Sequence, residues 1–324
     1  MYNPFSTVLT DFVIRNYRCF DDLKLEKLGR VNLITGKNNV GKSALLEAVR
    51  IWASFGNPAV LQDIVTSRNE NVQRSTAAAI WGLLSGRTLE EFVAGPSQEP
   101  LHASADGFYL KLSAGDVENE YDGADLSETK MDGRVRRYGH SFVPPNGIEV
   151  GEIEALWDVL ALTDLEDEVT KSLQLLLPDV ERVNLITKRP EGFRAPFVRI
   201  AGQSEPVPLK QLGDGMNRIF GIALALVAAK SQYLLIDEIE NGIHYSVQER
   251  IWELIFSEAT RLEVQVFATT HSWDCITAFQ KAAAKAGSAD CVLTRLESRR
   301  GRIVATQFVE EELEVVAREQ IEVR

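Results

Sequence analysis

The sequence predicts an α/β fold with a mostly parallel core sheet, and three segments are the reason. Residues 31–35 form an apolar strand candidate, a glycine-rich loop follows, and residues 44–52 read as a helix without Gly or Pro. Residues 233–236 are a second apolar run, with the length and bulk of a strand buried on both faces of a parallel sheet. A helix at 246–260 and a strand at 264–270 follow, which implies a right-handed crossover between two parallel strands.

The loop after the first of these strands completes the phosphate-binding pattern G-x-x-x-x-G-K-[ST]. Such a loop turns its backbone N–H groups inward on phosphates, and the helix N-terminus adds partial positive charge. Lys42 is expected to reach the β- and γ-phosphates, and the Ser43 hydroxyl to ligate Mg²⁺. An accidental Gly-Lys loop is the alternative, and the agreement of strand, loop and helix argues against it. The residues expected to contact the nucleotide here are Gly36, Asn38, Asn39, Val40, Gly41, Lys42 and Ser43.

Two carboxylates, Asp237 and Glu238, end the strand at 233–236. Ligands bind at the C-terminal edge of an open parallel sheet, so both side chains are expected at the nucleotide. Asp237 is expected to hold Mg²⁺ through water from the side opposite Ser43. Glu238 is expected to polarise the water that attacks the γ-phosphate, as a general base. The alternative is a structural strand that ends in two acidic residues without a role at a nucleotide.

Two further features belong to the same half of the chain. His271 ends the strand at 264–270 and is expected at the same sheet edge, as a γ-phosphate sensor rather than a structural histidine. Gly213, Asp214 and Gly215 precede an almost wholly apolar helix that runs through residue 227. Asp214 is expected to cap that helix, and the glycines allow a close backbone approach.

Composition favours a soluble cytoplasmic protein of one large or two ordinary domains. The three cysteines, Cys19, Cys275 and Cys291, have no spacing pattern and are expected to be reduced thiols. Residues 1–10 lack the basic start and apolar core of a signal peptide. The longest apolar stretch, residues 219–229, is too short to span a bilayer, so no membrane contact is expected.

The net charge of −12 disfavours broad, nonspecific DNA binding by the whole surface. Three local basic clusters nevertheless keep DNA as a candidate partner. They lie at residues 134–137, 188–194 and 295–302.

The motifs divide the chain into a nucleotide-binding core and an inserted middle. Residues 1–57 form the N-terminal part of the core, opened by a strand at 12–14 and containing the phosphate loop. Residues 58–206 are expected to form an inserted α/β lobe, in which residues 152–177 have helical periodicity. Residues 207–324 carry the remaining motifs of the core.

Taken together, the motifs resemble the ABC-type ATPases of the RecF/SMC/OLD group. The order and wide spacing of the segments 36–43, 212–218, 233–238 and 268–272 carry this resemblance. The chain looks most similar to stand-alone AAA-type ATPases related to the OLD (overcoming lysogenisation defect) proteins, but without their Toprim nuclease domain. The resemblance covers roughly residues 11–55 and 205–324. It implies a P-loop ABC-type ATPase head with an inserted lobe.

The resemblance also implies roles for residues. Ser43 and Asp237 would organise Mg²⁺, Glu238 would activate water, and His271 would be the switch histidine. Residues 12–20 resemble the group's first strand and arginine, so Arg18 would touch the nucleotide near its α-phosphate. Residues 237–244 resemble the acid pair and the following D-loop.

Gly213, Asp214 and Gly215 would occupy the signature position and read the γ-phosphate of ATP bound to a second protomer. Gly213 stands where the group has a serine, so backbone N–H groups would carry this recognition. The glutamine of the Q-loop has no clear counterpart, and Gln73 is the candidate.

The implied function is a Mg²⁺-dependent ATPase that dimerises, or forms higher homo-oligomers, around ATP and gates an effector. A separate Toprim-like nuclease in antiviral defence against phage is the expected effector. Two alternatives stay open: a RecF-like repair ATPase that binds DNA directly, and a non-hydrolysing scaffold held together by ATP. A transporter subunit fits less well, because the signature region lacks the usual sequence.

Overall fold

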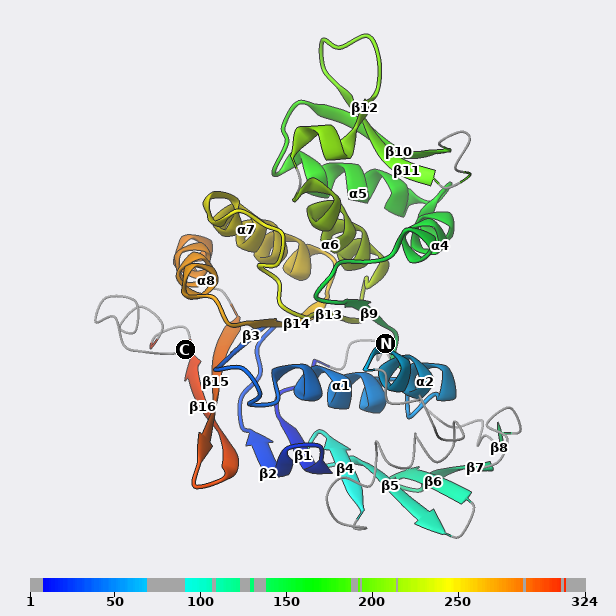
Figure 1. Ribbon diagram of the computed structural model, residues 1–324, viewed down its shortest axis with the longest axis vertical. Coiled ribbons are helices and arrows are strands. Elements are labelled where there is room, and N and C mark those ends of the chain that lie inside the picture. Colours follow the sequence, from blue (N-terminus) through cyan, green and yellow to red (C-terminus); the bar gives the residue numbers. More distant parts are fainter. Residues whose placement is uncertain are drawn as a thin grey trace, which may run out of the picture.

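A computed structural model describes residues 8–68, 91–106, 109–122, 129–130, 138–187, 192, 194–213, 215–287, 290–309 and 312. Two sheets and a small lobe make up this part of the chain (Figure 1). None of its helices combines the length and the apolar character that crossing a bilayer requires.

The core sheet has six strands in the order β16-β15-β3-β14-β13-β9. All neighbouring pairs are parallel except β15 and β16, which form an antiparallel hairpin. Parallel pairing of β13 and β14 confirms the crossover that the sequence predicted. The strands are β3 (Val31–Thr35), β9 (His140–Val143), β13 (Tyr233–Ile236), β14 (Gln265–Thr270), β15 (Cys291–Arg299) and β16 (Arg302–Val309).

Helices cover both faces of this sheet. On one face lie α1 (Lys42–Ala53) and α2 (Pro58–Ser67) (Figure 1). On the other lie α6 (Met216–Ala228), α7 (Tyr245–Arg261) and α8 (Trp273–Ala286). A strand covered on both faces is built mostly from apolar residues, as in β3 and β13. The polar residue inside β3, Asn32, donates to the carbonyl oxygens of Gly29 and Val266.

A second sheet, antiparallel, packs beneath α1 and has the order β2-β1-β4-β5-β6-β7-β8. Helix α1 therefore lies between two sheets, and eleven of its twelve residues are buried. The strands are β1 (Phe12–Tyr17), β2 (Phe20–Leu25), β4 (Phe92–Gly95), β5 (Leu101–Asp106), β6 (Tyr109–Ala114), β7 (Val117–Asp122) and β8 (Thr129–Lys130).

A small lobe packs on α6, at the top of Figure 1. Its core side chains, such as Trp157, Val169 and Leu173, join the cluster that contains α6. The elements of the lobe are α4 (Val150–Leu160), α5 (Asp164–Gln174), β10 (Val180–Thr187), β11 (Arg194–Ile200), β12 (Val207–Pro208) and a 3-10 turn η1 (Leu209–Leu212).

The prediction of helical structure at 152–177 needs a correction, because α4 and α5 are separate helices. Leu162 between them has a left-handed φ of 65°, which an α-helix cannot contain. Thr163 then caps α5 by accepting a hydrogen bond from the Leu165 N–H. The helical periodicity from Ile153 to Leu160 lies within α4 and does not extend across this turn.

Residues 58–206, which were expected to form one inserted lobe, contribute to both sheets and to the small lobe. Strands β4–β8 extend the sheet of β1 and β2, β9 is the edge strand of the core sheet, and α4–β12 build the small lobe. The expected cap of α6 also differs, because the N-cap is Gly215 without a side-chain hydrogen bond. Asp214 and Gln73 lie outside the described residues.

Candidate nucleotide-binding site

The phosphate loop joins β3 to α1, and its backbone requires glycine at both ends. Gly36 and Gly41 have positive φ values of 146° and 95°. A Cβ atom at Gly36 would overlap the Leu296 carbonyl oxygen, and one at Gly41 would overlap the Cys19 sulfur. Asn39, at φ 66°, is the third left-handed residue of the loop. The pattern of the loop is thus set by sterics as well as by phosphate chemistry.

Lys42 lies inside this loop rather than in solvent. Its Nζ donates to the carbonyl oxygens of Gly36 at 2.8 Å and Lys37 at 3.0 Å. Burial lowers the pKa of Lys42, while the carboxylates of Glu238, Asp237 and Glu240 act in the opposite direction. The loop carbonyls therefore hold the ammonium group at the place where the loop turns, facing the acid pair.

Asp237 and Glu238 follow β13 at the C-terminal edge of the core sheet, as the sequence predicted. Asp237 is 5% exposed, and its Oδ1 accepts a hydrogen bond from the Thr269 hydroxyl. The same hydroxyl oxygen accepts the Glu238 backbone N–H at 2.8 Å. Thr269 of the neighbouring strand β14 thus fixes both acids at once.

The backbone of Glu238 is held in an unusual conformation. Its φ is 47°, in the left-handed region that non-glycine residues occupy at a cost of about 1–3 kcal/mol. The Arg218 guanidinium, from the first turn of α6, donates to the Glu238 carbonyl at 2.8 Å and the Asp237 carbonyl at 3.0 Å. Asn241 donates to Glu238 Oε2 at 2.7 Å, so the carboxylate is fixed as well.

His271 follows β14 and reaches the same edge. Its Nδ1 lies 3.2 Å from Glu240 Oε1 and 3.6 Å from Glu238 Oε1. Its backbone N–H donates to Glu240 Oε1 at 2.9 Å. The structure therefore brings the phosphate loop, the acid pair and His271 to the ends of three adjacent strands, β3, β14 and β13.

Arg18 lies beside the phosphate loop, but its guanidinium is paired with a carboxylate of α1. Its Nε is 2.6 Å from Glu47 Oε2, and the Tyr17 hydroxyl donates to the same oxygen at 2.9 Å. Arg68 binds the other oxygen of Glu47 at 2.6 Å. Contact of Arg18 with the α-phosphate stays a prediction.

The glycines before α6 face the acid loop of their own chain. A Cβ atom at Gly215 would lie 2.8 Å from the Gly242 carbonyl oxygen, so these two segments touch. Gly213 has a φ of 139°. Gly215 therefore serves backbone packing between α6 and the loop after Glu238.

Several residues of the site gave no signal in the sequence. Arg218 also donates to the carbonyl oxygens of Pro144 at 3.0 Å and Pro145 at 2.8 Å, in the loop after β9. Asn241 contacts the Pro145 carbonyl as well, at 3.4 Å. This loop, residues 144–147, therefore belongs to the same sheet edge. Its signal would have been the short strand at 140–143, but only two of the four residues of this strand are apolar and its parallel pairing with β13 is nonlocal.

The donor set suits a nucleotide-bound divalent cation. A hydroxyl from Ser43 and a carboxylate from Asp237 are hard oxygen ligands, and Mg²⁺ commonly uses few protein ligands beside phosphate oxygens. Among the described residues, no group of three or more His, Cys, Asp or Glu side chains could hold a metal by itself. Phosphate oxygens would have to complete the coordination.

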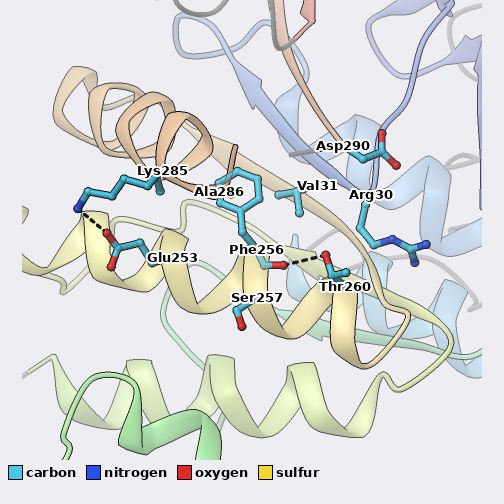
Figure 2. A pocket seen from close by; sticks show the side chains of 10 residues that line it. Arg30, Val31, Glu253, Phe256, Ser257, Thr260, Lys285, Ala286 and Asp290 are labelled. Atoms are coloured by element: carbon cyan, nitrogen blue, oxygen red, sulfur yellow. Dashed lines mark hydrogen bonds and ion pairs between the residues drawn. The ribbon is translucent and has the colours of Figure 1, made fainter. Parts of the chain in front are cut away.

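A cavity of about 520 Å³ lies elsewhere, between α7, α8 and the start of β3 (Figure 2). Arg30, Val31, Phe256, Lys285 and Asp290 are among its lining residues. Val31 is the first residue of β3, whereas the phosphate loop follows the last. The cavity is therefore at the opposite end of the parallel strands from the acid pair.

The basic clusters are partly neutralised where the structure describes them. Arg194 pairs with Asp158 at 2.5 Å, and both Arg295 and Arg299 pair with Glu297. Residues 134–137 and 188–189 lie outside the described part. The described arginines thus give no support to an open DNA-binding surface.

Two family models match the chain. One, described as "AAA domain, putative AbiEii toxin, Type IV TA system", matches residues 92–274, and another, described as "AAA domain", matches residues 12–76. The phosphate loop lies in the second match, and the acid pair and His271 lie in the first.

Two curated relatives are similar in sequence. A protein named "ATP/GTP phosphatase" from Helicobacter pylori is 21% identical over 321 residues, which cover 81% of this chain and 85% of that protein. An uncharacterised protein from Methanocaldococcus jannaschii is 51% identical over 41 residues, 13% of this chain and 19% of its own length.

Solved structures of SMC heads share the fold. The SMC head domain from Thermotoga maritima has a TM-score of 0.50 at 15% identity and covers 93% of this chain and 99% of its own. An SmcHead bound to the C-winged helix domain of ScpA has a TM-score of 0.57 at 12% identity and covers 95% of this chain and 100% of its own. The Smc head derived from Pyrococcus furiosus gives 0.53 at 11% identity, covering 96% and 99%.

The sheet order, the phosphate loop and the acid pair agree with these comparisons. The first family match spans more than half of the 324 residues. The chain therefore belongs to this AAA-domain family, and it is a P-loop ATPase with the fold of an SMC head.

Proposed function

We propose that this chain hydrolyses ATP with Mg²⁺ through Glu238, and that ATP joins two copies of the chain. The observation that supports this proposal most directly is that Lys42 and the acid pair lie at the same edge of the core sheet. Burial lowers the pKa of Lys42, and the charges of Glu238 and Asp237 act in the opposite direction, which supports a shared ligand for these groups.

Each residue has a distinct task in this proposal. Lys42 exchanges its loop carbonyl partners for the β- and γ-phosphates, and the loop N–H groups bind the same oxygens. Ser43 and Asp237 would hold Mg²⁺, which neutralises phosphate charge when bound. Glu238 takes a proton from the attacking water, and its side chain is open enough for this, at 32% exposure.

Support for a dimer comes from side chains at the same sheet edge. Tyr245 begins α7 and is 65% exposed, and Trp273 begins α8 and is 37% exposed. Large exposed aromatic side chains are typical anchors of protein interfaces. Gly215 of the signature segment contacts the loop at Gly242, so a second protomer is the proposed source of the phosphate that this segment reads.

The proposed biological task is to gate an effector in the manner of OLD-like proteins, in bacterial defence against phage. This step depends on the motif resemblance and on the toxin named in the family description. Fold alone does not fix such a task. The proposed effector is a separate Toprim-like nuclease, and co-purification of the native complex would identify what accompanies the chain.

The decisive experiment compares Glu238→Gln with Lys42→Ala. The first variant is expected to bind ATP normally and to lose about a hundredfold or more of its phosphate release. The second is expected to lose ATP affinity itself, because it removes a charge from the phosphates. Unchanged turnover in Glu238→Gln would remove Glu238 as the base, and unchanged affinity in Lys42→Ala would contradict the phosphate loop.

A further inference from the structure

We propose that Glu240 is a positioning residue, which orients the His271 ring so that Nε2 can accept a hydrogen bond from the water at the γ-phosphate. This inference rests on the proposed function, because it assumes that His271 acts at the nucleotide. Glu240 lies two residues beyond Glu238, in the segment 237–244 that resembles the acid pair and D-loop, and the resemblance gives Glu240 no role of its own.

The geometry joins Glu240 to His271 in two ways. Glu240 Oε1 accepts the backbone N–H of His271 at 2.9 Å and lies 3.2 Å from the ring Nδ1. The first contact is a hydrogen bond and fixes where the chain leaves β14. The second is a close approach to the ring, and Nδ1 has no hydrogen-bond partner among the described residues. One carboxylate oxygen therefore links the loop after β13 to the residue after β14.

The burial of Glu240 shows that this contact is built into the site. Its side chain is 8% exposed, whereas that of Glu238 is 32% exposed. Its Oε2 has no hydrogen-bond partner among the described residues. Buried carboxylates need compensating charge, and Glu240 acts to raise the pKa of both Lys42 and Arg218.

The chemistry of the imidazole follows from what surrounds Nδ1. The carboxylate oxygens near it, from Glu240 at 3.2 Å and Glu238 at 3.6 Å, accept hydrogen bonds and cannot donate them. In this proposal Nδ1 carries the proton, because both neighbouring oxygens can only accept, and Nε2 presents its lone pair away from the two acids. A nucleophile or base oriented by a third group is a recurring arrangement in catalysis.

Glu240 is poorly placed to replace Glu238 as the base. Its Oε1 is engaged by the backbone of His271, and its side chain is buried. Asn241 fixes Glu238 Oε2 at 2.7 Å, which leaves the more exposed acid directed toward solvent. The two acids thus have different partners and different tasks.

The test is a double-mutant cycle on ATP turnover. Glu240→Ala is expected to lower kcat by about tenfold or more with KM changed less than about threefold. Glu240→Gln keeps an acceptor oxygen for both contacts and is expected to retain most of kcat. In a His271→Ala background, Glu240→Ala is expected to cause little further loss. Additive losses would overturn the proposal.

A second readout does not require hydrolysis. In ¹⁵N spectra of labelled histidine, with His271→Ala for assignment, the wild-type ring is expected to carry its proton on Nδ1. Glu240→Ala is expected to move the ring toward the Nε2–H form, and Glu240→Gln to keep the Nδ1 proton. Glu249→Ala is the control, because Glu249 pairs with Lys285 on the surface of α7. An unchanged ring signal in Glu240→Ala overturns the proposal.

The two readouts separate the failure of this inference from the failure of the proposed function. If the wild-type protein released no phosphate, the proposed catalytic role would fail and the ring signal would still decide the orientation by Glu240. If Glu240→Ala failed to fold, Glu240→Gln with its kcat and ring signal would decide instead. Loss of the Nδ1 proton in Glu240→Gln would then overturn the proposal.

Discussion

The Arg218 guanidinium donates to the carbonyl oxygen of Glu238 at 2.8 Å, and so connects α6 to the acid pair. The same side chain is 9% exposed and binds the carbonyls of Pro144 and Pro145. Burial lowers the pKa of Arg218, while Glu240, Asp237 and Glu238 act to raise it. Three segments that are far apart in the sequence therefore meet at one cation.

Arg218→Lys is expected to reduce ATP turnover more than ATP affinity. A lysine cannot reach four carbonyl oxygens at once, so the left-handed backbone of Glu238 loses support. The free energy of unfolding is expected to fall by about 2–4 kcal/mol, since buried carbonyls lose their donor. Urea unfolding and steady-state phosphate release measure the two effects.

The matched control is Arg250→Lys. Arg250 also donates to two carbonyl oxygens, those of Leu175 and Leu176, but between α7 and the small lobe. This variant is expected to lose stability without a specific loss of kcat. Equal kcat values in the two variants, after correction for the folded fraction, would show that Arg218 has no particular role at Glu238.

Asn241 is expected to hold the carboxylate of Glu238 in the orientation that catalysis requires. Its Nδ2 donates to Glu238 Oε2 at 2.7 Å, which fixes the orientation of the proposed base. Asn241→Ala should lower kcat by about tenfold, and Asn241→Asp should lower it further, because a second negative charge would face Glu238. Single-turnover kinetics at saturating ATP provide the measurement. An Asn241→Asp variant as active as wild type would contradict this account.

The sequence predicted the parts of the site that repeat a local pattern. The strand at 31–35 and the strand at 233–236 were placed at their observed bounds, because burial on both faces favours mostly apolar residues. Gly36 and Gly41 were recognisable since only glycine fits their backbone. The parallel pairing of β13 and β14 was predictable from the order strand, helix, strand, because such crossovers have one preferred hand.

Other parts depend on contacts that no local pattern records. Strand β9 joins the core sheet only because His140–Val143 pairs with β13, about ninety residues later. Arg218 and Glu240 have polar side chains whose partners are backbone groups of distant loops. The break at Leu162 was missed because the periodicity that predicted the helix, from Ile153 to Leu160, lies within α4 alone.

Thr269 is expected to hold both Asp237 and Glu238 in place through hydrogen bonds to its single hydroxyl group. Thr269→Val keeps the shape of the side chain but removes the donor to Asp237 and the acceptor for the Glu238 N–H. Since Asp237 is a proposed metal ligand, the Mg²⁺ concentration for half-maximal turnover should rise several-fold, about threefold or more. Thr260→Val is the control, because that hydroxyl donates only to Phe256 of its own helix. An unchanged Mg²⁺ requirement would disprove the link.

His140 is expected to make the protein sensitive to acid. Burial, and next the Arg50 guanidinium, lower the pKa of His140 to about 4, below an unfolded value of about 6.5. Between these values the unfolded chain binds more protons, so stability falls as pH falls through this window. Urea unfolding should show a loss of about 2 kcal/mol from pH 7 to pH 5 that His140→Gln removes. His102→Gln, at a more exposed histidine paired with Glu91, is the control and should keep the acid loss.

ATP-dependent assembly is expected to require the exposed aromatic side chains at the start of α7 and α8, Tyr245 and Trp273. In the Glu238→Gln background, slow hydrolysis would preserve ATP, so ATP with Mg²⁺ should shift the mass from monomer to dimer in light scattering. Tyr245→Glu should weaken this shift while ATP affinity at low protein concentration stays the same, because Tyr245 is 65% exposed and starts α7 outside the phosphate loop. A bulky substitution at Gly215 would test the same assembly less clearly. Its side chain would also press on the Gly242 carbonyl of its own chain, whereas Tyr245→Glu changes an exposed side chain.

The control for this experiment is Leu162→Glu, at a 99% exposed residue of the small lobe. It changes charge and exposed apolar area to a similar degree but lies between α4 and α5, away from the ends of the core strands. Leu162→Glu should therefore dimerise like its parent. If Tyr245→Glu and Leu162→Glu both kept the ATP-dependent shift, the partner surface would lie elsewhere. If the parent showed the same mass with and without ATP, hydrolysis would have to proceed within one chain, and Gly215 would act only in packing against the loop at Gly242.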